Sequence, residues 1–186
     1  DQHKAGLLAL SLGQTDKARH YFKAALAAKP TALGSLSNLA HLEFRTANYS
    51  EAIKHYSRLL SFAPTNPFIT YRIYLCEILS GNLHPPDPNA FPPGAIQTYF
   101  ALAAYHSQTG NSTQSKQLFA EARARFPNLT SSYERDFALI QKSSNPQSRI
   151  NTESIEIELS TKDSAFQNPF PPSPENSPYS TNQPIQ

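Results

Sequence analysis

The stretch ARHYFKAALAAKP, residues 18–30, recurs in altered form as AIKHYSRLLSFAP at residues 52–64 and as SKQLFAEARARFP at residues 115–127. In each copy a small residue is followed by an aromatic residue four positions later, then by a small or aliphatic residue, and finally by proline. Steps of three and four place such residues on one stripe of a helix. Proline ends the helix, because it lacks a backbone N–H and its ring clashes with the preceding turn. The sequence therefore predicts three related amphipathic helices.

A second helical segment precedes two of these copies, as LSNLAHLEFRTANY at residues 36–49 and as YFALAAYHSQTGN at residues 99–111. Both segments carry small and apolar residues at helical spacing and end in residues that tolerate left-handed backbone. The first two closing prolines, Pro30 and Pro64, are 34 residues apart. The helices that we predict are 2–13, 16–28, 34–46, 49–62, 67–80, 95–108, 112–125 and 131–141.

A helix–turn–helix unit that recurs after 34 residues resembles the tetratricopeptide repeat family. The resemblance extends over about residues 2–127. It implies an all-α fold, a right-handed superhelical solenoid of stacked helix pairs. In that family small residues let paired helices approach closely, and here they are Gly6, Ala18, Ala40, Ala52 and Ala103. An ordinary helical bundle is the alternative, but it predicts no 34-residue register.

The stretch LHPPDPNAFPPGA, residues 83–95, lies where the second helix of a third repeat would fall. Its prolines exclude a helix. From Pro64 to Pro127 the chain is five residues shorter than two full repeats. We therefore predict that this loop replaces the missing helix, and that Leu83 and Phe91 pack down where that helix would lie.

The predicted organisation is one folded domain, residues 1–141, followed by a tail. The tail, residues 142–186, has sparse apolar residues without helical period, so we predict that it is disordered. A short helix at 131–141 is predicted to cap the domain with Tyr133, Phe137 and Ile140 facing inward. The predicted repeats are about 1–32, 33–66, a truncated 67–95, and 96–129.

Composition excludes several classes of function. The net charge of +2 is too small for the dense basic face that nucleic acid selects. No apolar run reaches the 18 residues or so of a membrane span, so none is predicted in this chain. Cys76 is the single cysteine and is predicted to be a buried, inert thiol. The six histidines lack the spacing of a metal pair, and phosphate-binding motifs are absent. We therefore expect no enzyme, no metal and no cofactor.

In the tetratricopeptide family the first helix of each pair lines the concave face of the solenoid. Arginine forks suit carboxylates, and aromatic rings suit the apolar side chains of an extended segment. The resemblance thus implies a protein–protein interaction adaptor or scaffold whose groove binds an extended, acidic peptide segment of a partner protein. The peptide-binding residues that we predict are Lys4, Asn38, His41, Arg45, Tyr71, Arg72 and Phe100.

Two further readings stay open. In the first, the chain is a structural spacer or an assembly segment of a longer repeat array, and it self-associates through an uncapped N-terminal helix. In the other, the acidic segment SIEIELS, residues 154–160, folds back into the basic groove of its own chain. The sequence begins at Asp1 and has no methionine, so we predict that it is a fragment or a processed product, and the presence of a targeting segment upstream stays open. The cytoplasm and the bacterial cell envelope both remain open as compartments.

Overall fold

The computed structural model describes residues 1–128 and 131–143, and this part of the chain is all-α. Every helix begins and ends within two residues of its predicted bounds. The predicted fold class is therefore confirmed. The helices are α1 (Gln2–Ser11), α2 (Thr15–Ala28), α3 (Leu33–Arg45), α4 (Tyr49–Phe62), α5 (Pro67–Leu79), α6 (Ile96–Gln108), α7 (Ser112–Arg125) and α8 (Ser131–Ser143).

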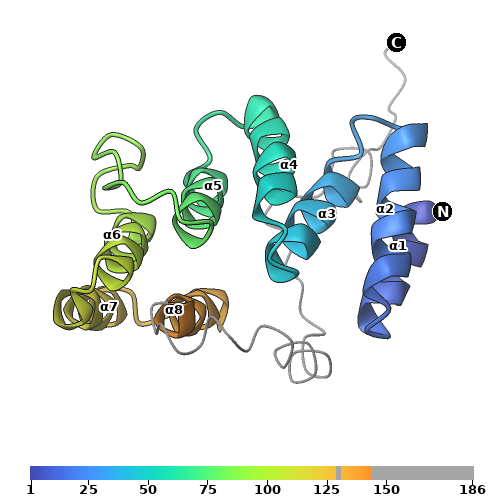
Figure 1. The fold of residues 1–186 in the computed structure, drawn as a ribbon. Helices are drawn as coiled ribbons and strands as arrows, with labels where there is room; N and C mark the ends of the chain where they lie inside the picture. Colours follow the sequence, from blue (N-terminus) through green and yellow to red (C-terminus); the bar gives the residue numbers. More distant parts are fainter. Residues whose placement is uncertain (129–130, 144–186) are drawn as a thin grey trace, which may run out of the picture.

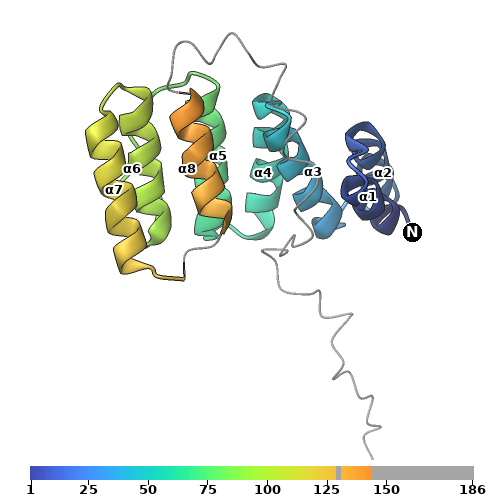
Figure 2. The ribbon, with the colours of Figure 1, turned by 90° about the horizontal axis from the view of Figure 1, so that it is seen from below.

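Consecutive helices pack side by side and build a curved row (Figure 1). Three tight pairs are formed by α1 with α2, by α3 with α4, and by α6 with α7. Helix α5 packs between α4 and α6 without a second helix of its own. Helix α8 turns back and lies beside α6 and α5, which both views of the ribbon show (Figure 2). None of the helices in the described part of the chain is long and apolar enough to cross a membrane.

Small residues bring the paired helices together, as the family resemblance implied. A Cβ atom added to Gly6 would lie 2.5 Å from the ring of Phe22, which is fully buried on α2. Ala18, Ala40 and Ala52 are also fully buried, each on a different helix. The close approach of each pair thus depends on the absence of a larger side chain at these positions.

Tight turns separate the helices of each pair. Gly110 has φ 87° and closes α6, and Ala47 has φ 58° and closes α3. Both backbones are left-handed, a conformation that glycine adopts without strain and alanine adopts at some cost. These are two of the turn positions that the sequence indicates.

The proline-rich loop carries no helix between α5 and α6, as predicted. Phe91 is buried at 6% exposure and packs into the main core, which confirms its predicted role. The same prediction for Leu83 is wrong, because its side chain is 49% exposed. Instead Tyr74 of α5 holds this part of the loop, since its hydroxyl donates a 2.7 Å hydrogen bond to the carbonyl oxygen of His84.

The predicted capping helix is present as α8, and two of its predicted inward residues, Tyr133 and Ile140, are buried. Helix α8 runs two residues beyond the predicted end, through Ser143. Residues 144–186 lie outside the described residues, and so do the predicted disorder of the tail and the proposed docking of residues 154–160.

Candidate functional site

The seven predicted peptide-binding residues lie on α1, α3, α5 and α6. They fall into two groups that we name by their place along the solenoid. The N-terminal half of the face comprises Lys4, Asn38, His41 and Arg45, and the C-terminal half comprises Tyr71, Arg72 and Phe100. Lys4 and Arg45 are exposed, whereas Asn38 and His41 are half-buried.

The C-terminal half is buried. Tyr71 is 0% exposed, and Arg72 and Phe100 are each 1% exposed. The cover is α8, which lies on the inner side of the curve made by α5, α6 and α7 (Figure 1). While α8 lies there, these three residues are not available to an external segment, contrary to what we expected of them.

Aromatic contacts join α8 to the C-terminal half. The ring of Tyr133 lies 4.7 Å from that of Phe100 and 5.8 Å from that of Tyr71, measured between centroids. The ring of Phe137 stacks in parallel on Phe119 of α7 at 3.8 Å. These contacts resemble the aromatic docking that was predicted for a partner, but the docked segment belongs to the chain itself.

A buried ion pair lies at the centre of this contact. Arg72 Nη1 donates to Asp136 Oδ1 at 2.8 Å, and the Tyr71 hydroxyl donates to Asp136 Oδ2 at 3.3 Å. The guanidinium also lies over the rings of Phe68 and Phe44, at 4.8 and 5.0 Å from their centroids. Burial alone would lower the pKa of Arg72, but Asp136, Tyr56 and Tyr71 together raise it above its usual value.

Asp136 is a residue of this contact that the sequence reasoning missed. It lies three residues after Tyr133 and four before Ile140, so it shares the inward stripe of α8. That spacing was the available signal, because a carboxylate on the buried stripe of a cap requires a buried cation opposite it. The sequence contained no sign that α8 would lie on the inner face instead of at the end of the stack.

His41, in the N-terminal half, lies in a buried setting with arginine side chains around it. Burial lowers the pKa of His41 well below its usual range, and Arg72, Arg45 and Arg135 lower it further. Three guanidinium groups from α5, α3 and α8 therefore lie near this imidazole. The acidic residue of α3, Glu43, does not offset them, because Arg19 of α2 already binds its carboxylate at 2.8 Å.

A hydrogen bond ties the first two helix pairs together at this surface. It joins His3 Nδ1 of α1 to Ser35 Oγ of α3 at 3.0 Å. Gly34 leaves room for the same imidazole, since a Cβ atom there would lie 3.2 Å from it. Lys4 is on α1, so this hydrogen bond helps to hold Lys4 in place relative to the residues of α3.

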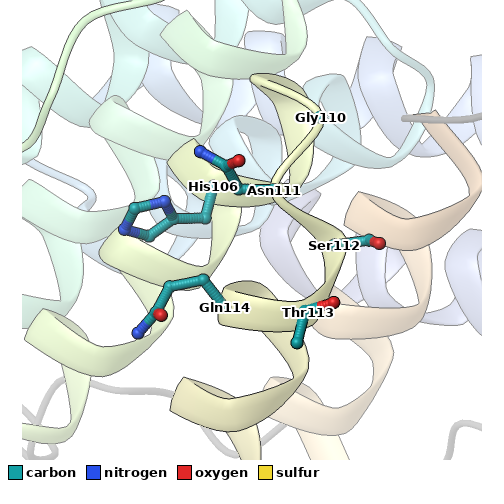
Figure 3. A pocket seen from close by; sticks show the side chains of 6 residues that line it. All are labelled: His106, Gly110, Asn111, Ser112, Thr113 and Gln114. Atoms are coloured by element: carbon teal, nitrogen blue, oxygen red, sulfur yellow. The ribbon is translucent and has the colours of Figure 1, made fainter.

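A separate hollow lies at the turn between α6 and α7 and contains none of the predicted residues. Figure 3 shows the side chains of His106, Asn111 and Gln114 on one side of the turn, while Ser112 and Thr113 point away from them. The lining has no carboxylate, lysine or arginine, so it offers no charged group to a ligand.

Chemistry-bearing groups outside this face are sparse. Cys76 is fully buried, and burial raises the pKa of its thiol to about 12, which leaves it un-ionised and inert. Among residues 1–128 and 131–143, no three His, Cys, Asp or Glu side chains are placed to hold a metal ion.

Comparison with known proteins gives one match. Residues 3–67 match the family model described as tetratricopeptide repeat. The match covers α1 to α4 and ends at the first residue of α5. Searches of curated proteins and of solved structures give no match.

Proposed function

We propose that this chain, which carries a tetratricopeptide repeat at residues 3–67, is a non-enzymatic adaptor that binds an extended acidic segment of a partner protein. The tetratricopeptide repeat is a generic protein–protein interaction module, and the repeat typically has no catalytic role. The proposed contact surface is the N-terminal half of the face, Lys4, Asn38, His41 and Arg45. The other three predicted residues are left to α8.

The observation that carries this proposal is the charge of that surface. Arg45 and Lys4 are exposed cations, and the exposed Arg135 of α8 makes a small further contribution to the positive charge around His41. Glu43, the one acidic residue of α3, binds Arg19 of α2 through its carboxylate at 2.8 Å. Arginine binds carboxylates through two parallel donors, and the asparagine amide is able to bind the backbone of an extended segment.

The test uses a fluorescein-labelled peptide of alternating Glu and Val, about a dozen residues long, and fluorescence anisotropy with the full chain. Arg45→Glu is expected to weaken binding at least tenfold, because the reversal replaces an attraction by a repulsion. Raising the salt concentration should weaken binding to the wild type. The matched control is Lys116→Glu, an exposed charge reversal on α7. Equal affinities for all three chains, or no binding to any, would overturn the proposal.

A structural role in assembly is the second candidate. It is supported by Leu8 of α1 and by Leu12, the residue directly after this helix, which are each 61% exposed. A solenoid normally covers such residues with another helix pair, so a second copy of this chain is the proposed occupant. Sedimentation velocity over a range of concentrations should show a dimer that Leu8→Glu abolishes and that Leu83→Glu, in the exposed loop, does not. A monomer at every concentration contradicts this role.

A further inference from the structure

We infer that the C-terminal half of the face is a site for an amphipathic helix, and that a partner helix with the pattern of α8 exchanges with α8 there. The pattern is an aromatic residue, a carboxylate three positions later, an aromatic residue directly after it, and an aliphatic residue three positions further on. Helix α8 presents it as Tyr133, Asp136, Phe137 and Ile140. This site differs from the N-terminal half in its position and in the conformation of its ligand, so the inference does not depend on the proposed function.

The carboxylate requirement follows from the surroundings of Arg72. Its side chain is 1% exposed. The rings of Phe44 and Phe68 lie 5.0 and 4.8 Å from its guanidinium. Asp136 supplies the opposite charge at 2.8 Å. A helix with a neutral residue at this position would leave the cation buried without that charge, which is strongly unfavourable. The site therefore selects helices by charge at one position.

The aromatic requirements follow from two pockets beside this ion pair. Tyr133 fits against Phe100 and Tyr71, and its hydroxyl oxygen accepts a 2.8 Å hydrogen bond from Gln97 Nε2. The second pocket is the ring of Phe119, on which Phe137 stacks. Together with the ion pair, these contacts fix the register of the bound helix.

The covered surface is mixed in composition. It contains Arg72, Gln97, Ser107 and Gln108 in addition to its aromatic rings. Gln108 Nε2 donates a 2.6 Å hydrogen bond to Ser143 Oγ at the end of α8. Aromatic residues and arginine are enriched in protein–protein interfaces, so this composition suits a helix supplied by another chain.

The repeat solenoid is continuous without α8. Helices α1 to α7 form an unbroken series of neighbours in which each packs on the next. Helix α8 adds to α6 and α5 from one side, and its opposite side, with Glu134, Arg135 and Ala138, is exposed. Release of α8 removes Tyr133 and Ile140 from the main core but breaks none of the contacts between successive helices α1 to α7.

The test measures binding of a labelled peptide of residues 131–143 to the full chain by fluorescence anisotropy. In the wild type the tethered α8 competes at an effective concentration of about 1 mM, so binding of the added peptide should be weak. In the Asp136→Asn chain, the tethered α8 no longer has a carboxylate to pair with Arg72. The added peptide still has this carboxylate. We expect the peptide to bind this variant at least tenfold more tightly than it binds the wild type.

Controls separate the ion pair from general effects on α8. Glu134→Gln in the chain removes an exposed carboxylate of α8, which lies 3.6 Å from Arg123, and should leave peptide affinity as in the wild type. A peptide that itself carries Asp136→Asn should bind neither chain. A second chain variant, Phe137→Ala, loosens α8 without removing the partner of Arg72, and it should also increase peptide binding even if Asp136→Asn does not fold.

The inference fails if the peptide binds the loosened chains no better than the wild type, or if the peptide carrying Asp136→Asn binds as well as the unchanged one. Formation of dimers by the wild-type chain through exchanged α8 helices would support it, since a second copy presents the same pattern. None of these outcomes affects the Arg45 experiment, which reports on the other half of the face.

Discussion

The two halves of the solenoid use similar helices but hold them together differently. In α1 to α4, small residues pack paired helices closely, and the ion pair of Arg19 with Glu43 joins residues 24 positions apart. In α5 to α8, one helix lacks a partner, and the ion pair of Arg72 with Asp136 joins residues 64 positions apart. Where the repeat is complete, neighbours in sequence suffice. Where it is incomplete, contacts between distant segments replace the missing packing.

The largest expected effect is on the long-range ion pair. Arg72→Leu should lower the free energy of unfolding by about 3–5 kcal/mol, because Asp136 is left buried without its cation. Arg19→Leu should cost less, about 1–3 kcal/mol. Glu43 is also buried, but the Arg19 side chain is 21% exposed, and Asn48 Nδ2 still donates a 2.9 Å hydrogen bond to the Glu43 carboxylate. Urea denaturation of the two variants measures both values.

A double variant sharpens this comparison. Arg72→Leu combined with Asp136→Leu removes both charges and should recover most of the lost stability, as replacement of buried ion pairs by apolar residues commonly does. If Arg19→Leu proves more costly than Arg72→Leu, the distinction between local and long-range stabilisation is wrong.

The next largest effect concerns the loop that replaces a helix. Phe91→Ala should lower the free energy of unfolding by about 3 kcal/mol, because it empties a buried site in the main core. Leu83→Ala is the matched control in the same loop and should change stability by less than about 0.5 kcal/mol, since this side chain is 49% exposed. Thermal unfolding of both variants measures the two losses of stability. Equal effects would mean that the loop does not substitute for the missing helix.

The repeat pattern was sufficient to predict the regular part of the fold. Helix positions and the absent helix before α6 follow from local spacing and from the chemistry of proline. The role of the small residues Gly6 and Ala18 was implied by the family resemblance. These features depend on residues a few positions apart. Local spacing carries that information because each repeat contacts mainly its neighbours.

The position of α8 could not be predicted in the same way. Its inward residues were identified, but the surface that they cover depends on which face of the solenoid offers a buried cation and aromatic pockets. Arg72 provides the buried cation and Tyr71 part of the aromatic surface. These two residues are 64 and 65 positions away from Asp136 in the sequence. One sequence contains no register that links two such distant segments, so Tyr71, Arg72 and Phe100 were interpreted as an open surface.

A smaller effect is expected in the regular half. Gly6→Ala should lower the free energy of unfolding by about 1–2 kcal/mol, because the added Cβ would lie 2.5 Å from the buried ring of Phe22. The higher helix propensity of alanine offsets only about 1 kcal/mol of the clash. Gly34→Ala is the matched control, since its Cβ would lie 3.2 Å from His3, and its net effect should be smaller. A stabilised Gly6→Ala chain would contradict close packing between α1 and α2.

The smallest effect is a pH dependence that belongs to the N-terminal half. Burial lowers the pKa values of His3, His41 and His55, and for His41 nearby guanidinium groups add to the effect. A histidine whose folded pKa lies below its unfolded value binds protons more readily in the unfolded chain. Stability should therefore fall as the pH drops from about 7 through the unfolded value near 6.5, and level off below the folded pKa values.

His41→Gln isolates the contribution of the imidazole that lies among Arg45, Arg72 and Arg135. The glutamine side chain does not titrate, so the difference in unfolding free energy between pH 7 and pH 5 should be smaller in the variant than in the wild type. Urea denaturation at the two pH values gives both differences. Helix α8 contributes Arg135 to this environment, and Asp136→Asn should therefore also reduce the dependence if it releases α8. An unchanged pH dependence in His41→Gln would mean that neither burial nor the nearby guanidinium groups lower the pKa of His41 in the folded chain.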